Sequence, residues 1–298
     1  MKRFFLTLLI LLLVLLIAVF IFNSTDKKVQ DIKPTVVVSI LPQKQFVEKI
    51  AQEKLNVVVM VPEGFSPATY EPTPNQLLQV SHADLYFRIG FIEFEKEYLD
   101  QIKNANPHIS FVETYKNNYL LKLEEHSHEK QSEETNTTET IDPHLWLDPK
   151  QVIQQVEIIT DALSKQYPHE SQYFFDNKER YIQELIALDQ ELKNDLENLN
   201  QKTILVYHPA FGYLAHAYGF IQKHIEVEGK EPTIQDLRTI INQAKQEKIT
   251  TVFVQKQFST KGAETISSEI NGQVIQLDPL AEDYLSNMRT IGQTIKNQ

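Results

Sequence analysis

The segment Glu170–Leu199, ESQYFFDNKERYIQELIALDQELKNDLENL, governs how the rest of the chain is interpreted. Its apolar residues recur at steps of three and four, which predicts one long amphipathic helix. They are Phe175, Tyr181, Ile182, Leu185, Leu188, Leu192, Leu196 and Leu199. About 30 residues, rising roughly 1.5 Å each, make a helix about 45 Å long. We expect a helix of that length to join two lobes rather than lie within one.

On both sides of this segment, short β-branched runs alternate with amphipathic stretches, which is the order of a mostly parallel sheet covered by helices. The expected strands are Val36–Ile40, Asn56–Val61, Asp84–Arg88, Ser110–Glu113, Thr203–Tyr207, Ile221–Ile225, Thr251–Gln255 and Gln273–Leu277. We therefore predict an α/β fold of two lobes with mostly parallel sheets. The N-terminal lobe is residues 34–168, the linking helix 169–200, and the C-terminal lobe 201–298.

The composition limits the kinds of ligand and metal site that the chain can have. The chain has 298 residues, a net charge of -11, nine His and no Cys. The negative charge argues against nucleic-acid binding, which needs clustered Lys and Arg, and favours a cation as any inorganic ligand. Without Cys, a strong metal site must be built from His, Asp and Glu.

The N-terminus predicts export. Lys2 and Arg3 precede an uninterrupted apolar run, Phe4–Phe22, as in a signal sequence. The run is close to the length that spans a bilayer, and no small-x-small cleavage site follows it. We predict that residues 1–33 are a signal or membrane anchor plus linker that contacts the membrane. The rest then works outside the cytoplasmic membrane, in a periplasm or on the outer face.

An acidic segment interrupts the first lobe. Residues 116–140 carry six Glu and few apolar residues after Leu123, which predicts a mobile surface loop. The loop also holds the pair His126 and His128.

Three residues of types that bind metals fall at loop positions next to strands or helices. His208 follows the strand Thr203–Tyr207, Asp278 follows Gln273–Leu277, and His144 precedes the helix that begins near Pro149. Ligands of open α/β sheets bind outside the carboxyl ends of the strands, so these residues are expected at one edge, with a cation between the lobes. Taken singly, each also has an ordinary explanation as a hydrogen-bonding loop histidine or a turn aspartate.

Five segments carry a family resemblance. They are Val38–Pro42 (VSILP), Pro67–Pro74 (PATYEPTP), Asp142–Pro149 (DPHLWLDP), His208–Tyr213 (HPAFGY) and Asp278–Leu280 (DPL). In this order they resemble the zinc/manganese-type solute-binding proteins of ABC transporters, the ZnuA/TroA-like family. The resemblance implies two α/β lobes joined by one long rigid helix and a metal bound between them. It also implies an ABC transporter membrane permease as partner, and no enzymatic activity.

Carried over by position, the resemblance puts the second, third and fourth metal ligands on His144, His208 and Asp278. A histidine at 208 resembles the zinc-type members, so Zn²⁺ is expected, with Mn²⁺ or Fe²⁺ as alternatives. The pair His126 and His128 resembles a much shortened form of the His-rich loop of those members.

The chain departs from the family at the first ligand, where Ala68 replaces the usual histidine. Three consequences are open. Water completes a site of three protein ligands; or Glu71, His126 or His128 substitutes; or the site is weakened. We favour the first two.

Two other functions compete with a metal receptor. A metal-dependent hydrolase also uses two His, an Asp and a water, but Glu71 is the only nearby candidate for a general base. A degenerate family member, acting as an adhesin or scaffold, would be compatible with Ala68.

Overall fold

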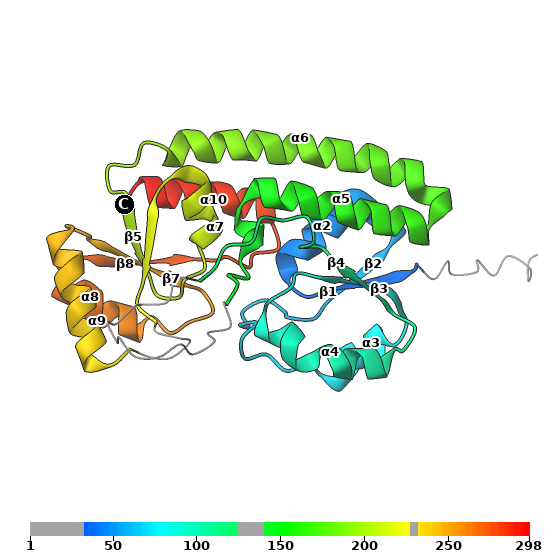
Figure 1. The fold of residues 1–298 in the computed structure, drawn as a ribbon, viewed down its shortest axis with the longest axis horizontal. Helices are drawn as coiled ribbons and strands as arrows, with labels where there is room; N and C mark the ends of the chain where they lie inside the picture. Colours follow the sequence, from blue (N-terminus) through cyan, green and yellow to red (C-terminus); the bar gives the residue numbers. More distant parts are fainter. Residues whose placement is uncertain (1–32, 124–139, 227–231) are drawn as a thin grey trace, which may run out of the picture. The chain divides into compact units, whose positions relative to one another are not determined.

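The first lobe is built on a four-stranded parallel sheet with strand order β2-β1-β3-β4. The computed structural model describes residues 33–123, 140–226 and 232–298. The strands are β1 (Thr35–Val38), β2 (Asn56–Val59), β3 (Ala83–Arg88) and β4 (Ser110–Glu113), and the helices α2 (Leu41–Ala51), α3 (Pro74–Val80) and α4 (Glu93–Ala105). Figure 1 shows α2 on one face of the sheet and α3 and α4 on the other. This double cover explains why the valines of β1 are fully buried.

The second lobe repeats the architecture. Its strands are β5 (Thr203–Val206), β6 (Ile221–His224), β7 (Thr251–Gln255) and β8 (Gln273–Leu277), and its helices α7 (Gly212–Tyr218), α8 (Ile234–Gln246), α9 (Lys261–Glu269) and α10 (Tyr284–Lys296). The order β6-β5-β7-β8 is again parallel throughout, with the lobe's first strand between its second and third. The prediction of two parallel-sheet α/β lobes is confirmed.

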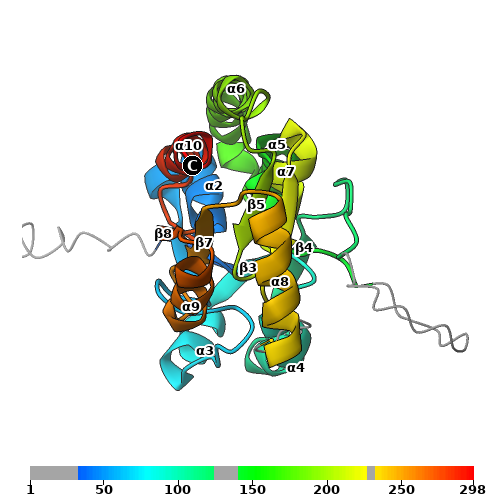
Figure 2. The same cartoon turned by 90° about the vertical axis from the view of Figure 1, so that its left-hand side faces the viewer.

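The long helix is α6 (Ser171–Leu196). It packs against α2 and α5 (Pro149–Gln166) from the first part of the chain and against α10 from the second lobe. Figure 2 shows α10 and α5 beneath it. The helix ends three residues before the predicted Leu199. Its buried face begins at Phe174 and not at the predicted Phe175, because Phe174 lies two full turns before the buried Tyr181.

One apolar core extends through the first lobe and α6 into β5, α7 and α10 of the second lobe. A smaller core lies between the second sheet and α8 and α9. The helices α6 and α10 approach closely: a Cβ on Gly292 would lie 2.6 Å from Leu192 Cδ2. Since the shared core joins both sheets to α6, the two lobes pack against the same long helix.

Some predictions fall outside the described residues. The apolar run Phe4–Phe22 and the pair His126 and His128 are among them. Within residues 33–123, 140–226 and 232–298, no helix has the length and apolar character needed to cross a membrane.

Candidate metal site

His144 is held by the residue two positions before it. Its backbone N–H donates to Asp142 Oδ1 over 2.9 Å, and its ring Nδ1 lies 2.7 Å from the same oxygen. The short turn Leu145–Leu147 follows, and α5 begins at Pro149 with Asp148 as its N-cap. The sequence Asp-Pro-His therefore fixes the ring locally, between a carboxylate and a helix start.

His208 is held from a neighbouring strand. Its Nδ1 lies 2.6 Å from Glu226 Oε2, and its backbone N–H donates to Gln255 Oε1 over 3.1 Å. The register explains the carboxylate: Val206 of β5 pairs with His224 of β6, so residues two positions further on each strand stand side by side. Glu226 is 7% exposed and therefore keeps little contact with water.

The two imidazoles lie together although they come from different lobes. Their ring centroids are 5.2 Å apart and their planes are inclined by 72°. Trp146 flanks His144, and Phe258 stacks on His208 at 5.1 Å. A carboxylate only accepts hydrogen bonds, so in the neutral form of each ring Nδ1 carries the proton and Nε2 keeps its lone pair. A carboxylate behind a histidine in this manner orients the ring and raises its basicity toward a metal.

Burial keeps His144 in the form that binds metals. Desolvation lowers the pKa of His144, and the charge and hydrogen bond of Asp142 oppose this without reversing it. The ring is therefore neutral at neutral pH, and a metal meets no competing proton there.

Asp278 follows β8 as predicted, but its oxygens contact other groups. Oδ1 accepts hydrogen bonds from Gln257 Nε2 and from the backbone N–H of Leu280, each over 2.9 Å. Oδ2 lies 3.8 Å from Lys256 Nζ. Within the described residues, no group of three or more His, Asp or Glu side chains is arranged to hold a metal ion. The structure thus unites His144 with His208 and leaves Asp278 paired with a lysine.

The remaining candidates lie elsewhere. Ala68 is exposed, and its backbone N–H donates to Ser66 Oγ. Glu71 is exposed and near Tyr98 of α4, where burial first and then the charge of Glu71 raise the pKa of the phenol. His126 and His128 are outside the described part of the chain.

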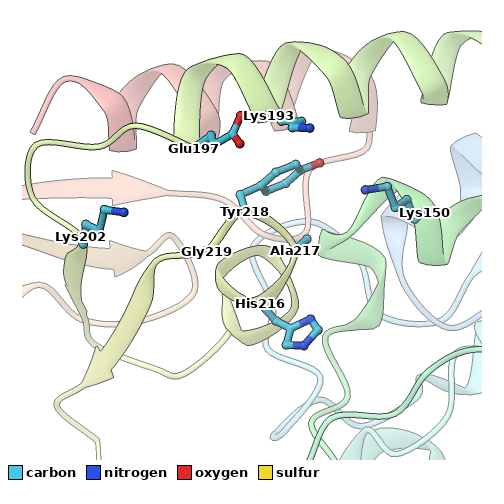
Figure 3. A pocket seen from close by; sticks show the side chains of 8 residues that line it. All are labelled: Lys150, Lys193, Glu197, Lys202, His216, Ala217, Tyr218 and Gly219. Atoms are coloured by element: carbon cyan, nitrogen blue, oxygen red, sulfur yellow. The ribbon is translucent and has the colours of Figure 1, made fainter.

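A separate hollow of about 400 Å³ lies near α7, the start of α5 and the end of α6 (Figure 3). It is lined by Lys150, Lys193, Glu197, Lys202, His216, Ala217, Tyr218 and Gly219. Three lysines against one glutamate make it unsuited to a divalent cation, since like charges repel.

Sequence reasoning missed Glu226. A carboxylate just past a strand was the available signal, but the weak strand Ile221–His224 belongs to no quoted motif. Only the pairing of β6 with β5 reveals its role. Asp142 belongs to the motif around His144, but the motif alone predicts no role for it.

The fold and the site define a class: two-lobed α/β binding proteins built on one connecting helix, with carboxylate-supported histidines from both lobes. The family described as zinc-uptake complex component A, periplasmic, matches residues 36–298. The chain belongs to this family, the zinc/manganese-type solute-binding proteins of ABC transporters. These are transport receptors and not enzymes, which removes the hydrolase alternative and confirms the prediction of no enzymatic activity.

Individual relatives and solved structures are similar to most of this chain. The high-affinity zinc uptake system protein ZnuA of Bacillus subtilis is 28% identical over 87% of this chain and 83% of its own length. The zinc-binding lipoprotein AdcA of Streptococcus pneumoniae is 29% identical over 95% of this chain, which spans only 60% of AdcA. A crystal structure of ZnuA superposes with a TM-score of 0.81 at 37% identity, covering 89% of this chain and 98% of that one. The TroA zinc-binding protein of Treponema pallidum, at 22% identity and a TM-score of 0.76, shares the fold.

Proposed function

We propose that this chain binds one divalent metal ion between its lobes, zinc in preference to manganese or iron, and delivers it to an ABC permease. The observation that carries the proposal is the pair of carboxylate-supported imidazoles, one from each lobe, with ring centroids 5.2 Å apart. Neutral imidazoles suit zinc better than the harder manganese ion. The family to which the chain belongs supports the same function.

Asp278 is the third ligand in this proposal, and water completes the coordination because Ala68 has no donor atom. To bind, the carboxylate exchanges its contact with Lys256 for the metal. Three protein ligands and a water are an established zinc arrangement. The apolar run Phe4–Phe22 is proposed as the export signal or anchor that places the chain outside the cytoplasmic membrane.

Metal binding is tested by stripping the purified chain with a chelator and reloading it with zinc, manganese or ferrous iron. Native mass spectrometry should find one zinc per chain, and titration should rank zinc tightest. His208→Ala should abolish tight binding, whereas His216→Ala, at an exposed ring on α7, should not. If no divalent cation stays bound to the wild type, the proposal is wrong.

Delivery needs a cellular experiment. Cells lacking this chain should grow poorly in zinc-depleted medium and recover with the wild type, but not with His208→Ala. Recovery with His208→Ala would show that zinc supply by this chain does not depend on metal binding at His208.

A further inference from the structure

One lysine contacts a carboxylate on each lobe. Lys256 Nζ lies 2.9 Å from Glu63 Oε1, in the loop that follows β2, and 3.8 Å from Asp278 Oδ2, just past β8. Lys256 is the residue after β7, and its backbone N–H donates to Leu277 O over 3.0 Å. A single ammonium thus connects the first lobe to an expected metal ligand of the second.

The sheet register places Lys256 next to Asp278. Gln255 of β7 pairs with Leu277 of β8, so Lys256 and Asp278 occupy the next positions of two adjacent parallel strands. Side chains at paired positions of neighbouring strands point to the same face. The backbone therefore places Lys256 beside Asp278, and the side-chain conformation of the lysine decides which carboxylate its ammonium approaches more closely.

The two oxygens of Asp278 are used differently. Oδ1 is taken by Gln257 and by the backbone of Leu280, and Oδ2 faces the lysine. Asp278 is 17% exposed, against 49% for Lys256 and 72% for Glu63. The carboxylate is fixed and partly desolvated, while the lysine and Glu63 lie at the water boundary. A long lysine stem with a mobile ammonium moves between two such acceptors at small cost.

We propose that Lys256 is a built-in competitor of the metal ion for Asp278, and that Glu63, the nearer partner of the ammonium, draws the lysine away from Asp278 and so favours metal binding. This inference rests on the proposed function, because it assigns Asp278 to the metal. The competition lowers the affinity of the site and keeps the cargo releasable. Glu63 acts in the opposite direction, since it supplies the other acceptor for the displaced ammonium.

The test is a zinc titration of the full chain against a chromophoric chelator at low salt. Lys256→Met keeps the stem and removes the charge, and it should lower the zinc Kd about three- to tenfold. Glu63→Gln should raise the Kd about two- to threefold, because the lysine then remains on Asp278. In the Lys256→Met background, Glu63→Gln should have no effect.

Lys245→Met is the matched control. Lys245 pairs with Glu269 at 3.8 Å on the surface of the second lobe, so the substitution removes one positive charge at similar exposure. Its zinc Kd should equal that of the wild type, which separates a local from a net-charge effect.

The outcomes are distinct. The inference is supported if Lys256→Met has a lower zinc Kd than the wild type and if Glu63→Gln no longer changes the Kd in the double variant. Zinc binding with an unchanged or weaker Kd in Lys256→Met overturns it and leaves the proposed function standing. Absence of zinc binding in the wild type and every variant overturns both.

Discussion

The two histidines of the candidate site have the same kind of partner but obtain it differently. His144 in the first lobe takes its carboxylate from Asp142, two residues earlier, which binds both its backbone and its ring. His208 in the second lobe takes its carboxylate from Glu226, 18 residues later and two residues past the end of β6. One half of the site is therefore a local turn, and the other half exists only when the sheet is formed.

This difference teaches which half is robust. The Asp142 side chain is short, and its carboxylate accepts a hydrogen bond from the backbone N–H of His144, so few other conformations are open to it. Glu226 has a longer side chain, and only the register of β5 with β6 and the charge-assisted bond keep it on His208. Weakening the carboxylate should therefore damage the second lobe's half more than the first.

The largest expected effect is that of Glu226→Gln. The amide loses the charge that attracts the ring proton, and because only the strand register holds this longer side chain, its NH₂ group can turn toward the ring in place of the accepting oxygen. His208 then loses its fixed orientation and part of its basicity, and the zinc Kd should rise about 10- to 100-fold. Competition titration with a chelator of known affinity measures the change.

Glu247→Gln is the control for this substitution, because Glu247 pairs with Lys223 at the surface. It should leave the zinc Kd unchanged. A Glu226→Gln variant that binds zinc within twofold of the wild type would show that Glu226 does not support the ligand.

The comparison also explains what could be predicted from sequence. The lobes and α6 were predictable because β-branched runs and a repeated three- and four-residue spacing are local signals. His144 and His208 were predictable because each adjoins a strand or helix end. Glu226 required the strand order, since its contact with His208 follows from the pairing of Val206 with His224.

Asp278 shows the same limit. Its position after β8 was predictable, but its neighbour Lys256 was not, because β7 and β8 had first to be paired in register. Contacts within a turn can be predicted from residues that are neighbours in the sequence, whereas contacts between strand ends depend on how the strands pair in the tertiary structure.

A glycine contact between the lobes gives the second prediction. A Cβ on Gly212, the first residue of α7, would lie 2.4 Å from Asp142 Oδ2. Gly212→Ala should displace Asp142 and with it His144, raising the zinc Kd about tenfold. The overpacking should also lower the free energy of unfolding by about 1–3 kcal/mol. Titration and chemical denaturation measure the two effects.

The double variant with Asp142→Ala is the control for Gly212→Ala. With the carboxylate gone, the added methyl group has nothing to displace, so the glycine substitution should cause no further loss of zinc affinity. If the losses of zinc affinity in the two single variants add up in the double variant, Gly212→Ala does not act through Asp142.

The third prediction concerns a hydrogen bond that links the loops carrying the proposed ligands His144 and Asp278. Trp146 is 1% exposed and donates from Nε1 to the carbonyl of Pro279, next to Asp278, over 2.7 Å. Trp146→Phe keeps an aromatic ring near His144 but leaves that carbonyl without its partner, lowering the free energy of unfolding by about 1–3 kcal/mol. The hydrogen bond also holds the loop of Asp278 in position, which should contribute about 0.7 kcal/mol to zinc binding. Its loss should therefore raise the zinc Kd about threefold.

Circular dichroism is the right probe for Trp146→Phe, because the chain has a single tryptophan and the variant has none. Leu147→Ala is a useful contrast: it removes a buried side chain from the same turn without touching the Pro279 bond. An unfolding free energy equal to the wild type in Trp146→Phe would show that the bond contributes nothing.

The smallest effect on zinc affinity is expected for Asp142→Asn. The amide oxygen can still accept from both the backbone N–H and the ring of His144, and the backbone contact holds the short side chain in place. Only the charge is lost and the orientation of the ring is kept, so the Kd should rise only about twofold, which corresponds to about 0.4 kcal/mol. Asp142→Ala, which has no acceptor, should cost clearly more. An Asp142→Asn variant that loses as much affinity as Glu226→Gln would mean that charge, and not local anchoring, supports both histidines.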